Sequence, residues 1–493
     1  MNKNNKKMKK IAELEPRIVW KIFEEITRVP RPSKKEVKIQ AFIESFADAH
    51  GLERKRDVKG NIVIVRPASP GREDEPALIL QSHMDMVCEK DSDIRIDFEN
   101  DPIEAYVDGE WVKARGTTLG ADCGIGMALQ MAVLIDPELH GPKIEALFTV
   151  DEEQGLTGAM NLGEGMLTGN RMINLDSEDE GEIFIGCAGG IDTVATLTYT
   201  PEPAPSTPDY EYYTIEVSGL HGGHSGDDIE KGFANSNKVL NRILWNLARK
   251  HGLRLSRFDG GNLRNAIPRE ARALAALPAG QVAAAGTAFR TLADEIIREF
   301  AYTETSMRIT FEPSAERSVH VLPADVQSRL LQVLYAVPHG VMAMSFAMPG
   351  LVETSTNLAS VKMPEEGRIV ITTSQRSSVE SAKRDIADRV AAVFALAGAE
   401  VRHTDGYPGW SPNPASPLVR KSSAIYREMF GRDPKVRAIH AGLECGLFLT
   451  RYPELDMIST GPTLRGVHSP AERVDIASVG KVWEYLRRLV EEV

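Results

Sequence analysis

Residues 126–155, GMALQMAVLIDPELHGPKIEALFTVDEEQG, carry the pattern that decides the fold. The run GMALQMAVLI (126–135) is long and apolar, as in a buried helix, and IEALFTV (144–150) is a short apolar run, as in a buried strand. Amphipathic helices are predicted at 17–29 and 37–49, and further strands at 61–65, 77–81 and 172–175. Because strands that alternate with helices indicate a mostly parallel sheet, this part of the chain is predicted to be an α/β domain.

A second kind of pattern begins after residue 188. Period-two alternation in GGIDTVATLTYT (189–200) and YYTIEVSG (212–219) predicts antiparallel strands with one solvated face. Helices are predicted near 237–250, 285–300, 324–336 and 379–397, with strands near 307–311, 352–361 and 368–374. We therefore predict an α+β domain, residues 189–401, inserted into an α/β domain made of residues 11–188 and 402–493. The Pro-rich segment 407–417 is interpreted as a linker or surface loop.

Composition excludes several classes of protein. The 493 residues hold 58 Lys+Arg and 70 Asp+Glu, a net charge of −12, which argues against a nucleic-acid or anionic-lipid partner. Four cysteines, none spaced as C-x-x-C, are too few for a disulfide scaffold. The lysine-rich first ten residues lack a following apolar run, so we expect a solvated tail and a soluble cytoplasmic protein. The uncharged stretch 330–352 is broken by Pro338 and is predicted to form a helix, a turn and a strand rather than a membrane span.

Histidine and acidic residues follow several of the predicted strands or open a helix. Taken singly, each has an ordinary explanation as a surface pair, a helix N-cap, an acidic turn or a buried loop histidine. Together they are harder to explain that way, because ligands bind at the carboxyl ends of strands in open α/β sheets. The candidate residues are His83, Asp85, Asp122, Glu152, Glu153, Asp176 and His468.

These side chains have the chemistry of a metal site. Two imidazoles and three carboxylates would suit a pair of Zn²⁺, Mn²⁺ or Co²⁺ ions that share a bridging carboxylate. Paired ions activate a water molecule, which still needs a base to accept its proton. Glu152 and Glu153 are adjacent and diverge in extended backbone, so one can face a metal and the other a substrate.

Eight segments of the chain resemble one family closely. They are LQSHMDMV, WVKARGTTLGADCGIGMA, DSEDEGEIFIGCAGGID, GGHSG, LRNAIPRE, YPGW, IHAGLECGLF and GVHSP. From about residue 11 onward the chain resembles the dinuclear zinc peptidase family that includes aminoacylases, glutamate carboxypeptidases and dipeptidases. The expected fold is therefore a mostly parallel-sheet metallopeptidase core with an inserted α+β lid or dimerisation domain.

The resemblance also implies roles for the metal-site residues. His83 and Asp176 are expected to bind one metal and Glu153 and His468 the other, while Asp122 bridges the two ions. Glu152 is expected to be the general acid/base, and Asp85 to orient His83. The family pattern further implies a cis peptide after Asp122. Relatives often have Asn where this chain has Cys123, which we expect to be a neighbour of the metals and not a ligand.

Further roles are implied for residues outside the metal site. His224 is expected to polarise the scissile carbonyl, and in dimeric relatives this histidine can come from the partner subunit. Asn265 and Arg376 are expected to hold the substrate, Arg376 by its terminal carboxylate, since a guanidinium can bind a carboxylate through two hydrogen bonds. Glu444 is a candidate for the α-ammonium group. Residues 274–320 carry no motif that we can use.

The implied function is a metal-dependent dipeptidase that hydrolyses unblocked dipeptides, including Xaa-His. We expect two divalent ions per subunit, zinc first and cobalt or manganese as alternatives, and a homodimer formed through the lid domain. An N-acyl amino acid deacylase or a carboxypeptidase would use the same dinuclear site and remains the alternative. An inactive binding scaffold is the third hypothesis, and the intact set of ligands argues against it.

Overall fold

The computed structural model describes residues 10–206 and 208–493, so most of the expected basic tail lies outside the described residues. The chain forms two compact units. The core unit runs up to Gly186 and includes Pro412–Ala438 and Leu443–Val493, and the inserted unit comprises Cys187–Ser411 and Ile439–Gly442. The inserted unit thus extends beyond residue 401, where we expected it to end.

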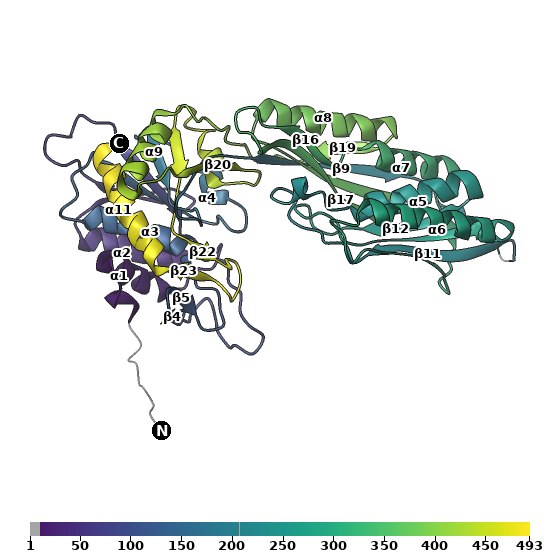
Figure 1. The fold of residues 1–493 in the computed structure, drawn as a ribbon, viewed down its shortest axis with the longest axis horizontal. Helices are drawn as coiled ribbons and strands as arrows, with labels where there is room; N and C mark the ends of the chain where they lie inside the picture. Colours follow the sequence, from purple (N-terminus) through teal and green to yellow (C-terminus); the bar gives the residue numbers. More distant parts are fainter. Residues whose placement is uncertain (1–9, 207) are drawn as a thin grey trace, which may run out of the picture. The chain divides into compact units, whose positions relative to one another are not determined.

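The core unit is built on an eight-stranded mixed sheet (Figure 1). Its order is β1 (Glu53–Arg56), β2 (Ile62–Arg66), β6 (Ile144–Thr149), β3 (Leu78–His83), β7 (Arg171–Asn174), β21 (Asp456–Ser459), β8 (Glu182–Cys187) and β20 (Lys435–Ile439). The four central strands, β6, β3, β7 and β21, are parallel to one another. Strand β1 pairs antiparallel with β2, β2 with β6, and β8 with β21. The predicted α/β class with a mostly parallel centre is confirmed.

Helices bury the apolar residues of this sheet. They are α1 (Arg17–Thr27), α2 (Val37–Ala49), α3 (Ala121–Ile135), α4 (Thr157–Met160), α9 (Pro417–Phe430), α10 (Glu444–Phe448) and α11 (Ile476–Glu492). Helix α3 packs on β3, β6 and α1, and its residues Met127–Val133 are wholly buried, as an all-apolar helix requires. It begins at Ala121, earlier than predicted, with a non-helical kink at Asp122 and Cys123. A small sheet of β22 (Leu464–Arg465), β23 (Arg473–Asp475), β5 (Trp111–Ala114) and β4 (Ala105–Asp108) completes the unit.

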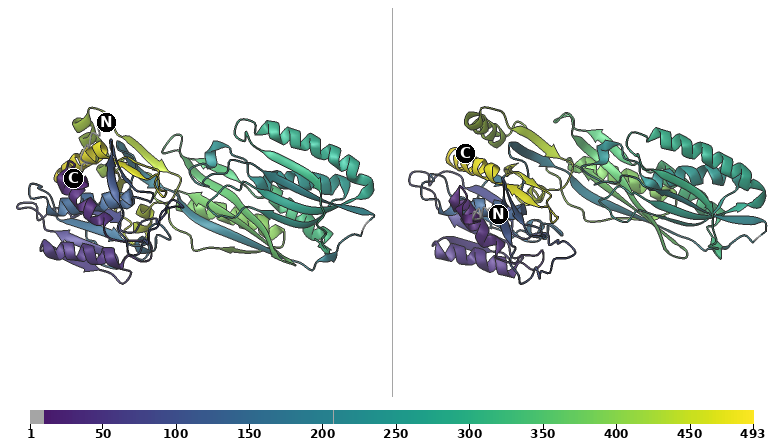
Figure 2. Two further views of the ribbon diagram at one scale, coloured as in Figure 1. Left: turned by 90° about the horizontal axis from the view of Figure 1, so that it is seen from below. Right: turned by 60° about the horizontal axis from the view of Figure 1, so that its bottom comes forward.

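The inserted unit is a nine-stranded sheet whose paired strands are all antiparallel. Its order is β14 (Arg308–Pro313), β11 (Tyr210–Ser218), β13 (Ala271–Pro278), β12 (Arg254–Gly260), β17 (Val352–Glu365), β18 (Arg368–Ser377), β9 (Gly189–Thr198) and β19 (Glu400–His403), with β16 (Gly340–Met344) paired to β17. Four helices cover one face of the sheet (Figures 1 and 2), namely α5 (Ser236–His251), α6 (Val282–Glu299), α7 (Ala324–Ala336) and α8 (Glu380–Leu396).

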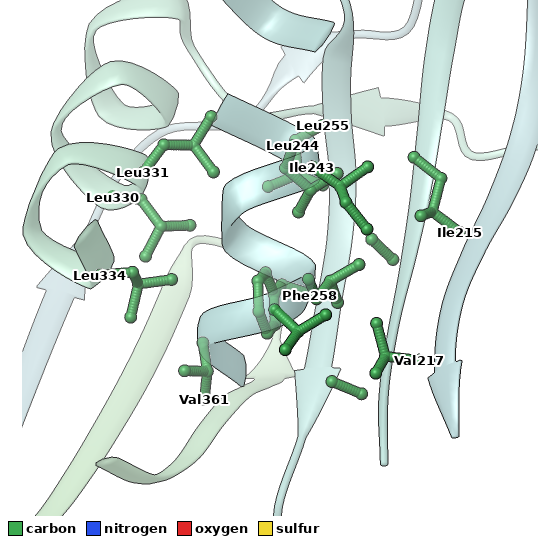
Figure 3. Packing of buried hydrophobic residues seen from close by; sticks show 14 of the residues in the cluster. Ile215, Val217, Ile243, Leu244, Leu255, Phe258, Leu330, Leu331, Leu334 and Val361 are labelled. Atoms are coloured by element: carbon green, nitrogen blue, oxygen red, sulfur yellow. The ribbon is translucent and has the colours of Figure 1, made fainter. Parts of the chain in front are cut away.

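The core of the inserted unit lies between these helices and the sheet. Figure 3 shows Leu244 of α5 and Leu330 of α7 among strand residues that include Ile215, Leu255 and Phe258. All five side chains are wholly buried, and each buried aliphatic or aromatic side chain contributes about 1.5–3 kcal/mol. The unit therefore has a hydrophobic core of its own.

The uncharged stretch 330–352 forms the end of α7, a turn, β16 and the start of β17, as predicted. Across the described ranges, no helix is long and apolar enough to cross a membrane. The segment predicted as a linker differs from expectation in its first part. Trp410 is buried and pairs with Cys187, and Tyr407 pairs with Gly190, so residues 407–411 belong to the folded inserted unit.

Candidate metal centre and substrate residues

Four parallel strands bring the predicted ligands to one edge of the core sheet. His83 is the last residue of β3, Glu153 comes after β6 beside the predicted base Glu152, Asp176 comes after β7, and His468 lies beyond β21, between β22 and β23. Because these strands are parallel, their carboxyl ends share one edge, where α/β sheets bind ligands. Segments that are far apart in the sequence are thus neighbours in space.

Asp122 stands between two imidazole rings. Its Oδ1 lies 3.1 Å from His83 Nε2, and its Oδ2 lies 3.1 Å from His468 Nε2. His83 Nε2 is also 3.3 Å from Asp176 Oδ1, and His468 Nε2 is 2.9 Å from Glu153 Oε2. The site therefore has two halves, each with one imidazole and one carboxylate, joined by a carboxylate that faces both.

Asp85 connects the first half to the glutamate pair. Its backbone oxygen lies 3.1 Å from His83 Nδ1 and its Oδ1 lies 3.4 Å from the same nitrogen. The same carboxylate accepts hydrogen bonds from the backbone N–H groups of Glu152 (3.0 Å) and Glu153 (3.3 Å). One wholly buried carboxylate thus orients the ring and fixes the turn that carries both glutamates.

The charges of the site fit bound cations. Burial raises the pKa of Glu152 well above its usual value and that of Asp176 to about 6. Hydrogen bonds to Asp122 and Glu153 raise the pKa of His468 to about 11, because both carboxylates approach its Nε2. Within the described part of the chain, Glu153 Oε1 and Asp176 Oδ1 have no hydrogen-bond donor. Buried carboxylates need a compensating charge, which divalent cations held by these residues would supply.

The peptide bond between Asp122 and Cys123 is cis, as expected. Cys123 Sγ lies close enough to His83 and Asp176 for the three to hold a metal ion, because their ligand atoms lie within 4.8 Å of one another. The thiol also donates a hydrogen bond to the backbone oxygen of Leu175 at 3.3 Å. Geometry thus places Cys123 beside the ligands. That it is a neighbour of the metals and not a ligand remains a prediction.

The inserted unit contains His224, Asn265 and Arg376. His224 Nδ1 accepts hydrogen bonds from the backbone N–H groups of Gly226 (3.3 Å) and Asp227 (3.2 Å). Nδ1 also lies 3.4 Å from Asp227 Oδ2, and the two backbone bonds favour the tautomer with its proton on Nε2, where the ring can donate. The loop is tied to the segment around Asn265, whose backbone oxygen accepts from Ser225 N at 2.8 Å.

Comparison with known proteins identifies the family. A model described as "Peptidase family M20/M25/M40" matches residues 79–492. This chain belongs to peptidase family M20/M25/M40. It is 42% identical over 487 residues to the cytosol non-specific dipeptidase of Escherichia coli (strain K12), covering 99% of both proteins.

Two solved structures resemble this chain. The aminoacylhistidine dipeptidase of Vibrio alginolyticus is 41% identical, covers 98% of each chain and superimposes with a TM-score of 0.91. A tripeptidase of Staphylococcus aureus, 15% identical with a TM-score of 0.56, covers 97% of this chain and 98% of its own and shares the fold. The motifs resemble those of aminoacyl-histidine dipeptidase, also called cytosol non-specific dipeptidase, and the two relatives at 42% and 41% identity confirm this resemblance.

Two of the predicted substrate residues of this M20/M25/M40 peptidase line one pocket. Asn265 and Arg376 line a cavity of about 160 Å³ in the inserted unit together with Tyr407. Arg376 is buried and donates from Nη1 to the Tyr407 hydroxyl at 2.8 Å, while its Nε has no acceptor among the described residues. Tyr407 lies in the segment that we interpreted as a linker, and the Pro-rich composition of that segment concealed its half-buried position in the folded unit.

Glu444 belongs to the core unit. Its Oε2 accepts hydrogen bonds from Gln81 Nε2 and Thr149 Oγ1, both at 2.7 Å, and burial raises its pKa to about 8. Its Oε1 has no donor in the described residues. A role in substrate binding stays a prediction that rests on this one oxygen.

Proposed function

We propose that this peptidase is a metal-dependent dipeptidase that hydrolyses unblocked dipeptides, including Xaa-His. The observation that carries the proposal is the pair of half-sites around Asp122, with Glu152 held next to them by Asp85. Two relatives at 42% and 41% identity, which cover nearly the whole chain, are named as dipeptidases. Their cytosolic and aminoacylhistidine designations support a cytoplasmic location and acceptance of Xaa-His substrates.

The metal ligands follow from the two half-sites. His83 and Asp176 would hold one cation, Glu153 and His468 the other, and Asp122 both. Two divalent cations, Zn²⁺ first and Co²⁺ or Mn²⁺ as alternatives, would polarise the scissile carbonyl and lower the pKa of a water molecule. This assignment is supported by the donor set and by Glu153 Oε1, which has no hydrogen-bond partner among the described residues.

Glu152 is proposed to move the proton. Burial raises the pKa of its carboxylate well above the usual value. A carboxylate with a raised pKa is a stronger base, so it can accept a proton from water and give it to the leaving amine. His224 is proposed to donate from Nε2 to the carbonyl oxygen as negative charge develops there.

Separate residues are proposed to recognise the two ends of the dipeptide. Arg376 and Asn265 would bind the terminal carboxylate, since the Nε–H group of Arg376 has no acceptor among the described residues. Glu444 would accept from the α-ammonium through Oε1. Free ends on both sides of one peptide bond define an unblocked dipeptide.

A substrate panel tests the proposal. Apo-protein is loaded separately with Zn²⁺, Mn²⁺ and Co²⁺ and assayed with free dipeptides, N-acetyl and N-succinyl amino acids, and longer peptides. We expect fast release of amino acids from free dipeptides, including Xaa-His, and little from N-acyl amino acids or longer peptides. Preferential cleavage of N-acyl amino acids would favour a deacylase, and release of single residues from the carboxyl end of longer peptides would favour a carboxypeptidase.

We also propose a homodimer formed through the inserted unit. Its strand β16 exposes Met342 and Met344, which are 38% and 43% exposed, and Phe346 just after it is fully exposed. Large apolar side chains on and beside one strand are typical of interaction surfaces. Sedimentation equilibrium of the wild type and of Met344→Glu/Phe346→Glu would test this, with a monomeric double variant as the expected result.

A further inference from the structure

The loop that carries Asp122 is held by a carboxylate that belongs to neither half-site. Glu472 Oε2 accepts hydrogen bonds from the backbone N–H groups of Leu119 (2.7 Å) and Gly120 (3.0 Å), and Oε1 from those of Ala121 (2.7 Å) and Asp122 (3.2 Å). Glu472 is only 2% exposed. Four consecutive backbone donors therefore converge on one buried carboxylate, and such charge-assisted bonds are the strong ones.

Glu472 also belongs to the turn that carries His468. Its backbone N–H donates to the oxygen of Ser469 at 3.0 Å, and the Ser469 hydroxyl donates to Gly466 O at 2.6 Å. His468 itself has a φ of 59°, a left-handed conformation that costs energy for a residue with a Cβ. The turn is thus fixed at both ends, and Glu472 connects it directly to the backbone of Asp122.

Arg31 holds the same loop from the other side. The guanidinium donates from Nη1 to the backbone oxygens of Met84 (3.1 Å) and Asp85 (2.7 Å), and from Nη2 to that of Gly120. Arg31 is 1% exposed. A Cβ at Gly120 would lie 2.6 Å from Arg31 Nη2, and Gly120 has a φ of 69°, so this position requires glycine.

We propose that Glu472, assisted by Arg31, is a positioning residue that sets the separation of Asp122 and His468 and thereby the affinity of the His468–Glu153 half-site for its cation. The inference rests on the proposed ligand set. Neither residue touches the substrate or the reacting atoms in this scheme. Outer residues that orient metal ligands change metal affinity or activity by about 10- to 100-fold when they are replaced.

The test compares two isosteric variants. In Glu472→Gln the amide keeps one acceptor oxygen but turns an NH₂ group toward two of the four backbone donors. Glu145→Gln is the matched control, because Glu145 is wholly buried in the same unit and accepts from the backbone N–H groups of Thr168 (2.7 Å) and Gly169 (3.1 Å), in contact with none of the proposed ligands. Both apo-proteins are titrated with Co²⁺ and followed by visible absorption, with stoichiometry from elemental analysis.

We expect Glu472→Gln to bind the second Co²⁺ about 10- to 100-fold more weakly than the wild type, with its turnover recovering at excess Co²⁺. Glu145→Gln should titrate as the wild type does, even if its melting temperature falls equally. Wild-type binding of both ions by Glu472→Gln, or equal weakening in Glu145→Gln, would overturn the proposal. If Glu472→Gln does not fold, Arg31→Lys is tested in its place, because a lysine ammonium cannot span the backbone oxygens of Asp85 and Gly120. Wild-type binding of both ions by Arg31→Lys would then overturn the proposal.

His468→Ala separates this inference from the proposed ligand set. Loss of the second ion in His468→Ala but not in Glu472→Gln contradicts the positioning role alone. Retention of both ions in His468→Ala contradicts the ligand assignment on which that role rests.

Discussion

Glu152 and Glu153 are neighbours in the sequence, but their carboxylates have different surroundings. Glu153 Oε2 lies 2.9 Å from His468 Nε2, whereas the raised pKa of Glu152 reflects burial without a direct imidazole partner in the described residues. We expect Glu152→Gln to lower kcat by about 100- to 10 000-fold with both metals bound, because a general base is lost. Glu153→Gln is the paired control and should lose metal. Near-normal turnover of metal-loaded Glu152→Gln would refute its role as the base.

Cys123 allows a second prediction at this scale. Zinc accepts thiolate ligands, and the thiol lies within reach of the same ion as His83 and Asp176. Because the thiol donates to Leu175 O, we expect it to remain protonated and outside the metal shell. The Co²⁺-loaded protein should then lack a near-ultraviolet sulfur-to-cobalt charge-transfer band. A band that disappears in Cys123→Ser would contradict this expectation.

The sequence could indicate the ligands but not what holds them. His83, Asp122 and Asp176 are recognisable because each polar residue interrupts an apolar element at its end. Glu472 gives no such signal, since its partners are backbone groups about 350 residues away. Arg31, in the run PRPSKK, resembles a surface basic residue although it is buried. Backbone acceptors and donors carry no side-chain pattern, so sequence reasoning missed both residues.

At the scale of elements, apolar periodicity predicted the long helices and many of the strands, but several strands were not predicted, and one of these is instructive. Strand β13, ARALAALP, was not predicted because alanine is disfavoured in strands. It forms because it lies between β11 and β12, where Ala273, Ala275 and Ala276 are almost completely buried. Pairing with two neighbours therefore outweighs the local preference, and no single-sequence pattern reveals such pairing.

Helix α5 offers a prediction at the same scale. Its N-cap, Asn235, accepts from the backbone N–H groups of Asn237 (3.0 Å) and Lys238 (3.3 Å) and donates to Leu358 O at 2.9 Å. Asn235→Ala should lower the free energy of unfolding by about 1 kcal/mol through loss of the cap and by about 1 kcal/mol through loss of the hydrogen bond to β17. Hydrogen exchange should then quicken in α5. Ser416→Ala, at the N-cap of α9 in the core unit, is the control and should leave α5 unchanged.

Two buried histidines should make the stability of the whole inserted unit depend on pH. Burial and the nearby Arg376 lower the pKa of His440 to about 4, and burial lowers that of His339 to about 3. In the unfolded chain both would titrate near 6.5, so between about pH 6.5 and 4 the unfolded state binds more protons. Stability should therefore fall as pH falls, by up to about 1.4 kcal/mol per pH unit for each histidine. Urea unfolding of apo-protein at several pH values should show a shallower dependence in His339→Gln/His440→Gln, and an unchanged slope would contradict the assignment.

Metal removal should destabilise the core unit but not the inserted unit. Every proposed ligand belongs to the core unit, and the inserted unit has its own hydrophobic core. A cation bound only by the folded protein stabilises it by RT ln(1 + [L]/Kd), about 4 kcal/mol at a thousandfold excess over Kd. Exhaustive chelation should therefore abolish turnover and quicken hydrogen exchange at the carboxyl ends of β3, β6, β7 and β21, while α5–α8 keep their protection. His224→Ala should lose turnover but keep this metal-dependent protection, because its imidazole is proposed to act on the substrate. Equal loss of protection in both units, or activity that survives chelation, would contradict a metal site confined to the core unit.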